Sequence, residues 1–426
     1  MARVFTPKDG HIIMNLLVKQ ATGQQSITVV DSSTFVSAGE LVISTGMENV
    51  LNSLSYVLNG LIIATRPYNA RMRIVDMKEV GPFSNLTRKI SFYSKFAKPD
   101  GSHNTDLFTN LANGFTAGEN ELNGNPQSTK SQWEQNPPIP LELKFGGTTV
   151  WQDSVTQYED QIKAAFRDDA EWARFLTGYM EEHANDIESQ KEAFYRLVLL
   201  NRMGMAYDMN SYSNVSAKNL TTEFNAFFGT SYTSAQLRSV YLKDFLAFMV
   251  ATIKADSDFL EERDTKAHWP VPKTIGADTY NILRHTPKNR QKLALYSPLF
   301  RMAESLVLPE IFNPNYLSIE NYEGVTYWQT DNTDLTRPTI DIIPAITDAD
   351  TTSATYGKQI AGAEVKLDYV VGFLFDKEAC LAELQHESAR TTSVEARKGY
   401  RNTWNTFAKN MISDPTEKAI LYYMAD

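Results

Sequence analysis

The sequence predicts an α+β fold, and three features of its 426 residues lead to this prediction. Alternating apolar and polar residues, typical of strands, flank a long polar tract between Arg71 and Asp153. An apolar period of 3.6 residues, typical of a helix, then continues to about Gly204. The rest of the chain mixes short strand-like and helix-like segments and ends in a strand-rich tail. A content of 42% hydrophobic residues is typical of a globular protein with a sizeable core.

Residues 1–68 are expected to form an extended N-terminal arm, because their apolar residues stand in short runs between polar ones. A helix period from Val50 to Leu61 predicts one short helix near residues 47–59. The arm does not open with a basic region followed by an apolar run. No stretch of the chain approaches the roughly 18 apolar residues that a membrane span needs. We therefore expect a cytosolic, soluble protein.

Residues 69–156 are expected to form a long projecting hairpin. Ile90 and Phe92 alternate with polar residues, and on the return Leu141 and Leu143 share one face. In a monomer the strand edges of such a hairpin would be unpaired, whereas natural proteins normally cover or blunt their edges. The hairpin is therefore a candidate for contact with another molecule.

The tip of this hairpin, Lys98–Pro140, consists mostly of Asn, Gly, Ser, Thr, Gln and Pro. Compact domains rarely hold so long a stretch without core-forming periodicity, so the tip should find partners outside its own domain. Aromatic side chains on a slender hairpin are hard to bury, and for four of them we expect intersubunit contact: Phe92, Tyr93, Phe96 and Trp133. For four others we expect core packing instead: Trp151, Tyr400, Trp404 and Phe407.

Residues 157–209 are expected to hold one helix of about 35 residues, about 50 Å long at 1.5 Å per residue. Asp168 or Asp169 could cap its start, and Gly204 is placed to end it. Acidic residues lie mostly off the apolar stripe. The stripe comprises Trp172, Phe175, Leu176, Tyr179, Met180, Ala184, Ile187, Phe194, Leu197 and Leu200.

Residues 210–362 show a mixed pattern, with helix periods at 234–259 and 297–312 and strand-like segments at 292–297 and 323–330. A polar loop is expected at Thr347–Ala363. The last segment, residues 363–426, should begin with a strand that turns into a short helix or turn near Cys380. Further aromatic and apolar segments then close the chain.

Motifs of catalysis and of ligand binding are missing from the sequence. The six histidines are scattered without an HExxH pair, and one cysteine cannot build a cysteine-rich zinc site. There is no GxSxG, GxxxxGK[ST] or GxGxxG, so we assign no catalytic, cofactor-binding or metal-binding residue. Cys380 is interpreted as a buried small hydrophobic residue. The acidic run Asp256–Asp264 is interpreted as a solvated helix end rather than a calcium loop.

The formal net charge of −10 and a pI near 5.3 argue against sequence-specific nucleic-acid binding, which depends on clustered Lys and Arg. An enzyme would need titratable groups that converge in a pocket, and the sequence offers no candidate cluster.

The order of arm, long hairpin, long helix, mixed domain and strand-rich return resembles the major capsid proteins of tailed bacteriophages, with their Hong Kong 97-type fold. The chain is most similar to those of small short-tailed phages that infect Gram-positive bacteria. Two stretches support the resemblance. In Ser297–Thr330 a helix leads to a hydrophobic strand after a Gly, and in Val370–Tyr423 an apolar strand closing on an Asp precedes an aromatic strand and a final apolar one.

The resemblance implies a division into five parts: an N-arm (1–68), an E-loop projection (69–156), a P-domain with a spine helix (157–209), an A-domain (210–362) and return strands of the P-domain and A-domain (363–426). It implies a non-enzymatic subunit that forms hexamers and pentamers of an icosahedral or prolate shell. The shell would be assembled in the host bacterial cytoplasm and would enclose double-stranded DNA without sequence-specific contact.

The partners implied are further copies of the chain, a scaffolding protein and a portal protein, with no membrane, and the location implied is the virion capsid. An encapsulin-like cellular compartment is an alternative with the same fold. An enzyme or binding module with a large flexible loop is a further alternative from another class.

Overall fold

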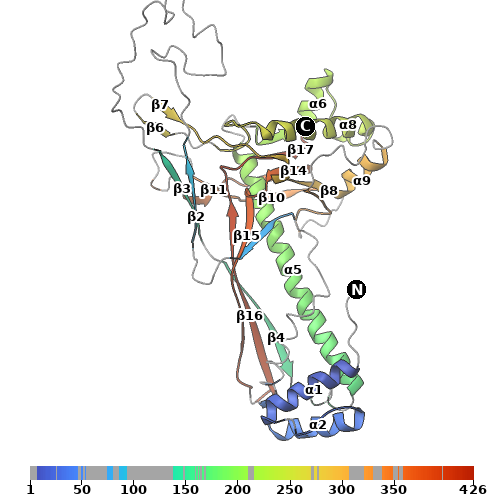
Figure 1. Ribbon diagram of the computed structural model, residues 1–426. Coiled ribbons are helices and arrows are strands. Elements are labelled where there is room, and N and C mark those ends of the chain that lie inside the picture. Colours follow the sequence, from blue (N-terminus) through green and yellow to red (C-terminus); the bar gives the residue numbers. More distant parts are fainter. Residues whose placement is uncertain are drawn as a thin grey trace, which may run out of the picture.

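The computed structural model describes residues 7–24, 26–46, 49–50, 53, 74–79, 86–93, 138–146, 149–158, 160–161, 163, 166, 169–209, 215–269, 273–275, 278–306, 321–329, 338–348, 354, 358–395 and 397–426. Helices and strands both contribute, as the predicted α+β class requires. The molecule is elongated along one helix, α5 (Asp169–Met209), which has 41 residues and is about 60 Å long at 1.5 Å per residue. Two helices lie at one end of α5 and a five-stranded sheet at the other (Figure 1).

Helix α5 confirms the predicted long helix, but Gly204 does not end it. Gly204 lies five residues before the last residue of α5, where a Cβ atom would be 3.1 Å from the side chains of both Ile342 and Pro344. The glycine therefore lets β10 (Ile340–Ile342) and the turn after it approach the helix closely. A helix cap and a close approach both favour glycine, so the sequence pattern could not distinguish them.

The predicted apolar stripe of α5 is correct in part. Trp172, Phe194 and Leu200 are buried, Ile187 is half-buried and Leu197 is exposed. From 198 to 206 every side chain is buried, because the helix there contacts strands on several sides. Amphipathic periodicity is lost in that stretch. Five stripe side chains lie outside the described part of the chain: Phe175, Leu176, Tyr179, Met180 and Ala184.

The N-terminal arm is helical rather than extended. Helices α1 (Pro7–Thr22) and α2 (Ser32–Ser44) pack against each other and against the start of α5 (Figure 1). Their buried residues surround the rings of Phe166 and Trp172, which stack with centroids 4.5 Å apart. The sequence analysis missed the helix period in α1, which is formed by the buried residues Ile13, Met14, Leu17, Val18 and Ala21. The short helix expected at 47–59 lies mostly outside the described residues.

The five-stranded sheet at the other end of α5 has the order β5-β17-β14-β8-β9. Helix α5 covers one face, and α6 (Leu220–Phe228) and α8 (Leu242–Glu261) cover the other. Successive residues of β8, such as Ala294 and Leu295, enter the cores on opposite faces of the sheet, so this strand is buried throughout. The strands are β5 (Ala217–Asn219), β17 (Ala419–Tyr423), β14 (Val370–Asp376), β8 (Gln291–Tyr296) and β9 (Asn321–Val325).

The helix periods expected in the central region are confirmed. The segment 234–259 forms α7 (Ser234–Leu237) and most of α8. The helix predicted at 297–312 is α9 (Ser297–Leu306), and residues 307–312 lie outside the described part of the chain. The strand-like segments 292–297 and 323–330 correspond to β8 and to the end of β9. Helix α6 was not predicted.

A four-stranded sheet in the order β1-β15-β16-β4 runs beside α5. Its strands are β1 (Asp76–Glu79), β15 (Cys380–Thr391), β16 (Tyr400–Ser413) and β4 (Thr149–Tyr158). The turn expected near Cys380 is present at residues 377–379, but no helix follows it, because the chain continues as strand β15. Strand β4 continues beyond Asp153 to Tyr158, so the long helix α5 does not follow the hairpin directly. Strand β1 pairs in parallel with β15 and does not belong to the hairpin.

Small antiparallel pairs complete the described structure. The loop expected at Thr347–Ala363 is partly structured, because β11 and β12 pair across it. The pairs are β2–β3, β6–β7, β10–β13 and β11–β12. The bounds of the elements not yet given are β2 (Leu86–Phe92), β3 (Pro140–Gly146), β6 (Lys273–Ile275), β7 (Asp278–Tyr280), β11 (Ala345–Thr347), β12 (Gln359–Ala361), β13 (Val365–Leu367) and the 3-10 helix η4 (Lys288–Arg290).

Candidate functional site

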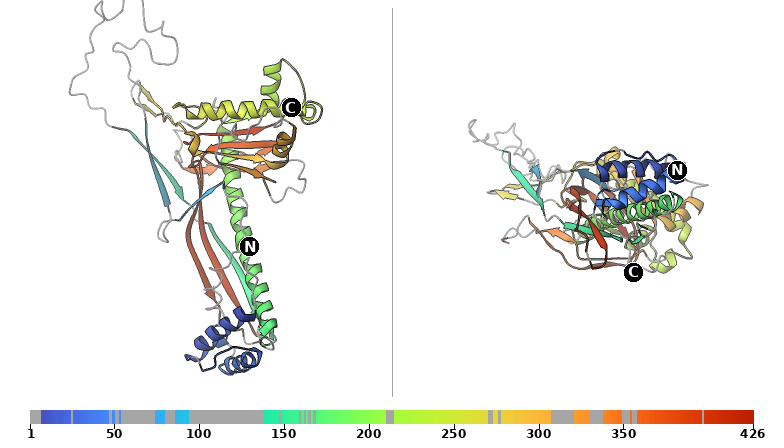
Figure 2. Two further views of the ribbon diagram at one scale, coloured as in Figure 1. Left: turned by 45° about the vertical axis from the view of Figure 1, so that its right-hand side comes forward. Right: turned by 90° about the horizontal axis from the view of Figure 1, so that it is seen from below.

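Strands β2 and β3 form the hairpin that the sequence predicts, with an antiparallel register from Leu86 opposite Gly146 to Phe92 opposite Pro140. The hairpin lies to one side of the molecule, away from α6 and α9 (Figures 1 and 2). Residues 94–137, which include most of the polar tip, lie outside the described residues. The described part of the hairpin has two faces of different character.

The inner face of the hairpin is held by a cluster of charges. Lys89 Nζ contacts a carboxylate oxygen of Asp414 and lies 2.6 Å from Oε1 of Glu417, which is also 3.2 Å from Nε of Arg284. Burial lowers the pKa of Lys89, but the two carboxylates more than offset this effect and hold the pKa above its ordinary value. Burial raises the pKa of Asp414, yet the Lys89 charge and the hydrogen bonds to the carboxylate bring it below its ordinary value.

Polar and apolar contacts extend this inner attachment. The Thr87 hydroxyl donates to both carboxylate oxygens of Glu383 at 2.8 Å. Leu143 and Phe145 are buried against Ile412 of β16. Because alternate residues of both strands are fixed in this way, the subunit itself sets the direction in which the opposite face of the hairpin points.

The outer face of the hairpin is exposed and partly apolar. Phe92 is 56% exposed, and Ile90 beside it is exposed as well. Tyr93, in contrast, is only 9% exposed, which leaves little of its surface for a neighbouring subunit. Phe96 and Trp133 lie outside the described residues. Among the four side chains expected at an intersubunit contact, Phe92 is the one that the described structure shows to be available.

The aromatic residues for which core packing was expected divide into two groups. Phe407 is buried, as predicted, whereas Trp151 and Trp404 are each 39% exposed, so core packing was wrong for them. Residues three apart on a strand point to opposite faces, so Trp404 cannot share the buried face of Phe407. The rings of Trp151 and of Phe194 on α5 make an edge-to-face contact, and their centroids are 6.3 Å apart. Tyr400 is half-buried.

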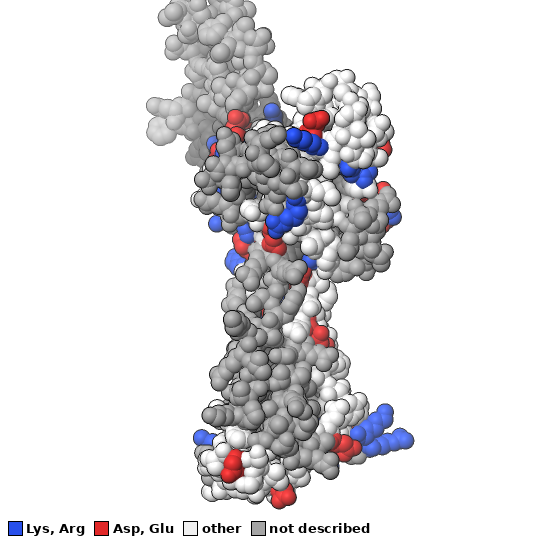
Figure 3. All heavy atoms as spheres, turned by 90° about the vertical axis from the view of Figure 1, so that its right-hand side faces the viewer, with Lys and Arg blue, Asp and Glu red and all other residues white. Residues whose placement is uncertain are grey.

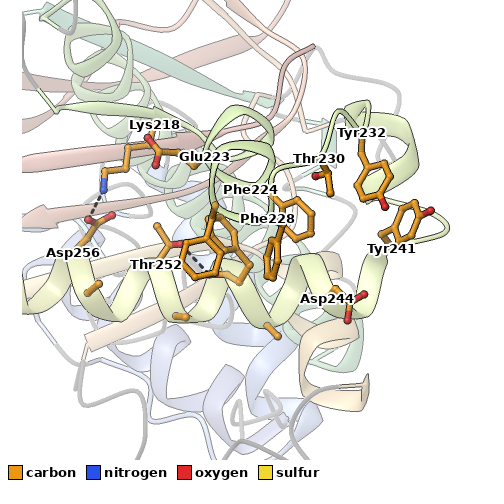
Figure 4. Close-up of a pocket in the computed structure, with 15 residues that line it drawn as sticks. Lys218, Glu223, Phe224, Phe228, Thr230, Tyr232, Tyr241, Asp244, Thr252 and Asp256 are labelled. Carbon is orange, nitrogen blue, oxygen red and sulfur yellow. Dashed lines mark hydrogen bonds and ion pairs between the residues drawn. The ribbon is translucent and has the colours of Figure 1, made fainter.

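A second surface is a groove between α6 and α8, which we call the aromatic groove (Figure 4). It has a volume of about 800 Å³ and is lined by Phe224, Phe227 and Phe228 of α6 and Phe248 of α8, among others. Phe227 is 74% exposed. The sequence analysis missed this groove, although its phenylalanines at positions i, i+3 and i+4 are the helix period that could have revealed α6.

Charged groups stand at both ends of the aromatic groove. At one end Lys218 Nζ lies 2.5 Å from Oδ1 of Asp256, whose other oxygen accepts from the Tyr422 hydroxyl at 2.9 Å (Figure 4). Burial raises the pKa of Asp256, and Lys218 offsets part of this effect. The prediction of a solvated helix end at Asp256–Asp264 is therefore wrong for Asp256, which is buried. Glu223 and Asp244 are exposed and have no ion-pair partner among the described residues.

Cys380 is fully buried, as the sequence predicts, and burial raises the pKa of its thiol to about 12. Buried His268 has its pKa lowered to about 4 by burial. The described residues contain no group of three or more His, Cys, Asp or Glu arranged to hold a metal ion. None of the described helices is long and apolar enough to span a membrane. On the face in Figure 3, the described basic and acidic side chains are interspersed.

No protein-family model matches the sequence, and no curated protein matches it. In structure, the chain is similar to chains in several solved bacteriophage structures. Over 84% of its length it matches 85% of a chain in the capsid of Staphylococcus phage Andhra, with 10% identity and a TM-score of 0.49. It also matches, over 82% of its length, 83% of a chain in the structure of the head fiber and inner core protein gp22 of bacteriophage P68, with 12% identity and a TM-score of 0.48.

A further similar structure is the capsid of cyanophage P-SCSP1u. There the match covers 83% of this chain and 87% of the other, with 9% identity and a TM-score of 0.41.

Proposed function

We propose that the chain is the major capsid protein of a tailed bacteriophage and assembles as hexamers and pentamers into a shell around double-stranded DNA. The observation that carries this proposal is the hairpin β2–β3, which is fixed on its inner face and exposes the apolar side chains of Ile90 and Phe92 on its outer face. Because the inner face fixes the hairpin, Phe92 stays exposed to water in the single subunit. Contact with another molecule would bury this apolar side chain, which is favourable. The proposed role is structural and requires no catalytic residue.

The elongated form of the subunit supports the same role. Helix α5 separates two ends by about 60 Å, and exposed apolar side chains occur at both, with Ile12 and Leu16 on α1 and Phe227 on α6. Subunits that join through different surfaces form rings when the rotation closes. An elongated subunit with separate apolar surfaces is suited to contacts with several neighbours at once.

In this proposal each part of the chain has a place in the shell subunit. Residues 1–68 are the N-arm, 69–156 the E-loop, 157–209 the P-domain with α5 as spine helix, 210–362 the A-domain and 363–426 the return strands. The subunit would be assembled in the host bacterial cytoplasm together with scaffolding and portal proteins. Packaged DNA would meet no sequence-specific site, in keeping with the net charge of −10.

Electron microscopy and sedimentation of the purified chain, with and without a co-expressed scaffolding protein, test this proposal. Closed shells of uniform size are expected. A monodisperse monomer at high concentration under both conditions would refute the capsid role.

A variant separates folding from assembly. Replacing residues 98–137 with a short Gly/Ser link should change the melting temperature of the subunit little, because loop-closure entropy varies slowly with length. The same replacement should prevent shells from forming, since the E-loop would lose contacts to its neighbour. Normal, stable shells from this variant would show that the tip is not an intersubunit contact.

A further inference from the structure

We propose that the aromatic groove between α6 and α8 receives the outer face of the hairpin β2–β3 from a second copy of the chain. The outer face consists of Arg88, Ile90, Phe92, Glu142 and Lys144. This inference rests on the proposed function, because it assigns one of the contacts by which subunits would join.

The two surfaces match in apolar character. The outer face presents Ile90, which is 61% exposed, next to Phe92. The groove presents the exposed rings of Phe227 and Phe228, whose centroids are 4.9 Å apart. Seating the hairpin in the groove would remove apolar surface of both partners from water, which is favourable, and would allow aromatic edge-to-face contacts. The hairpin brings no large ordering cost, since its inner face already holds it in place.

The two surfaces are also complementary in charge. On the outer face Arg88 and Lys144 share one carboxylate, that of Glu142, at 3.5 Å and 3.7 Å. One positive charge is therefore in surplus. The groove offers the carboxylates of Glu223 and Asp244, which have no ion-pair partner among the described residues. Opposite charges facing each other in this way fix partner and register more than they add affinity.

The positions of the two surfaces favour a contact between copies. In the views of Figures 1 and 2 the hairpin lies beside one end of the part of the molecule that holds the five-stranded sheet, and helix α6 lies at the other end of that part. They cannot meet within one chain. A donor surface on one side and a receptor surface on the other is the arrangement that a head-to-tail contact requires, and repetition of the contact closes a ring when the rotation fits.

A charge exchange tests the contact. Arg88→Glu should lower the yield of assembled shells about tenfold, because a like charge would then face the groove, and the exposed position should leave the circular dichroism spectrum and melting temperature unchanged. Adding Asp244→Arg to the same chain should restore assembly. The matched control is Glu261→Arg, an exposed residue of α8 outside the groove, which should assemble normally. Normal shells from Arg88→Glu, or a defect that Asp244→Arg does not relieve, would overturn the inference.

Crosslinking gives an independent readout. Cys380 is fully buried, so cysteines introduced as Ile90→Cys and Phe227→Cys are the reactive thiols of the folded chain. A bismaleimide should join assembled copies of the double variant into a ladder on a denaturing gel, whereas each single variant should lack the ladder. Intact shells that yield no ladder would overturn the contact and leave the capsid role standing. Wild-type chain that forms no shell would instead refute the proposed function.

Discussion

Replacing Lys89 by methionine should loosen the hairpin β2–β3 from its own subunit. The carboxylates of Asp414 and Glu417 that share the Lys89 ammonium group have side chains only 0% and 7% exposed. Methionine keeps the apolar stem but leaves both carboxylates without this cation. Removing one partner of a buried ion pair costs roughly 3–5 kcal/mol. Arg284, 3.2 Å from Glu417, still compensates part of the charge, so we expect about 3 kcal/mol.

Hydrogen exchange of the β2 and β3 amides, followed by mass spectrometry, is the suitable assay, because the hairpin can open without global unfolding. A loss of about 3 kcal/mol should accelerate exchange in both strands on the order of 100-fold, since each 1.4 kcal/mol is a factor of ten. The matched control is Lys144→Met on the outer face, where the side chain is 53% exposed. Its effect should stay within about 0.5 kcal/mol.

A second substitution checks the physical cause. Adding Asp414→Asn to Lys89→Met removes the unpaired buried charge, so the double variant should recover part of the protection that Lys89→Met loses. If exchange in Lys89→Met matched that of wild type and of Lys144→Met, the charge cluster would not hold the hairpin, and the reasoning would be refuted.

Three further predictions concern other parts of the chain. Gly204→Leu should destabilise the protein by about 1–3 kcal/mol in urea unfolding, because even a Cβ would be 3.1 Å from Ile342; wild-type stability would contradict the close approach. Hydrogen bonds from Thr34 lower the pKa of Asp31 to about 2 from 3.8, so its cap should stabilise α2 fully above about pH 4 and lose this effect as the pH falls toward 2; an NMR titration midpoint near 3.8 would refute the cap. Cys380 should react with thiol reagents only after denaturation, and rapid labelling of native protein would disprove its burial.

The sequence by itself determined the elements whose residues repeat with a clear period. Alternation around Ile90 and Leu143 predicted the two hairpin strands, and the 3.6-residue period predicted the long helix α5. Burial of Cys380 and Phe407 also followed from local apolar context. These predictions succeed because a strand or helix with one covered face must place its apolar residues at fixed spacings.

The tertiary structure alone decided which partner each element meets. Trp404 is a large aromatic residue within a strand, yet 39% of it is exposed. Asp256 lies in an acidic run typical of a surface, yet it is buried and pairs with Lys218 and Tyr422. Of the two surfaces that we propose to join subunits, the hairpin could be predicted but the aromatic groove could not, because the groove exists only where α6 lies against α8.

The charge cluster beneath the hairpin shows the same limit. Lys89 and Asp414 are 325 positions apart in the chain, and no local pattern marks them as partners. Periodicity indicates which residues of a helix or strand face the protein core. The identity of a distant partner depends on how complete sheets and helices pack, because only that packing brings the two groups together and excludes water from between them.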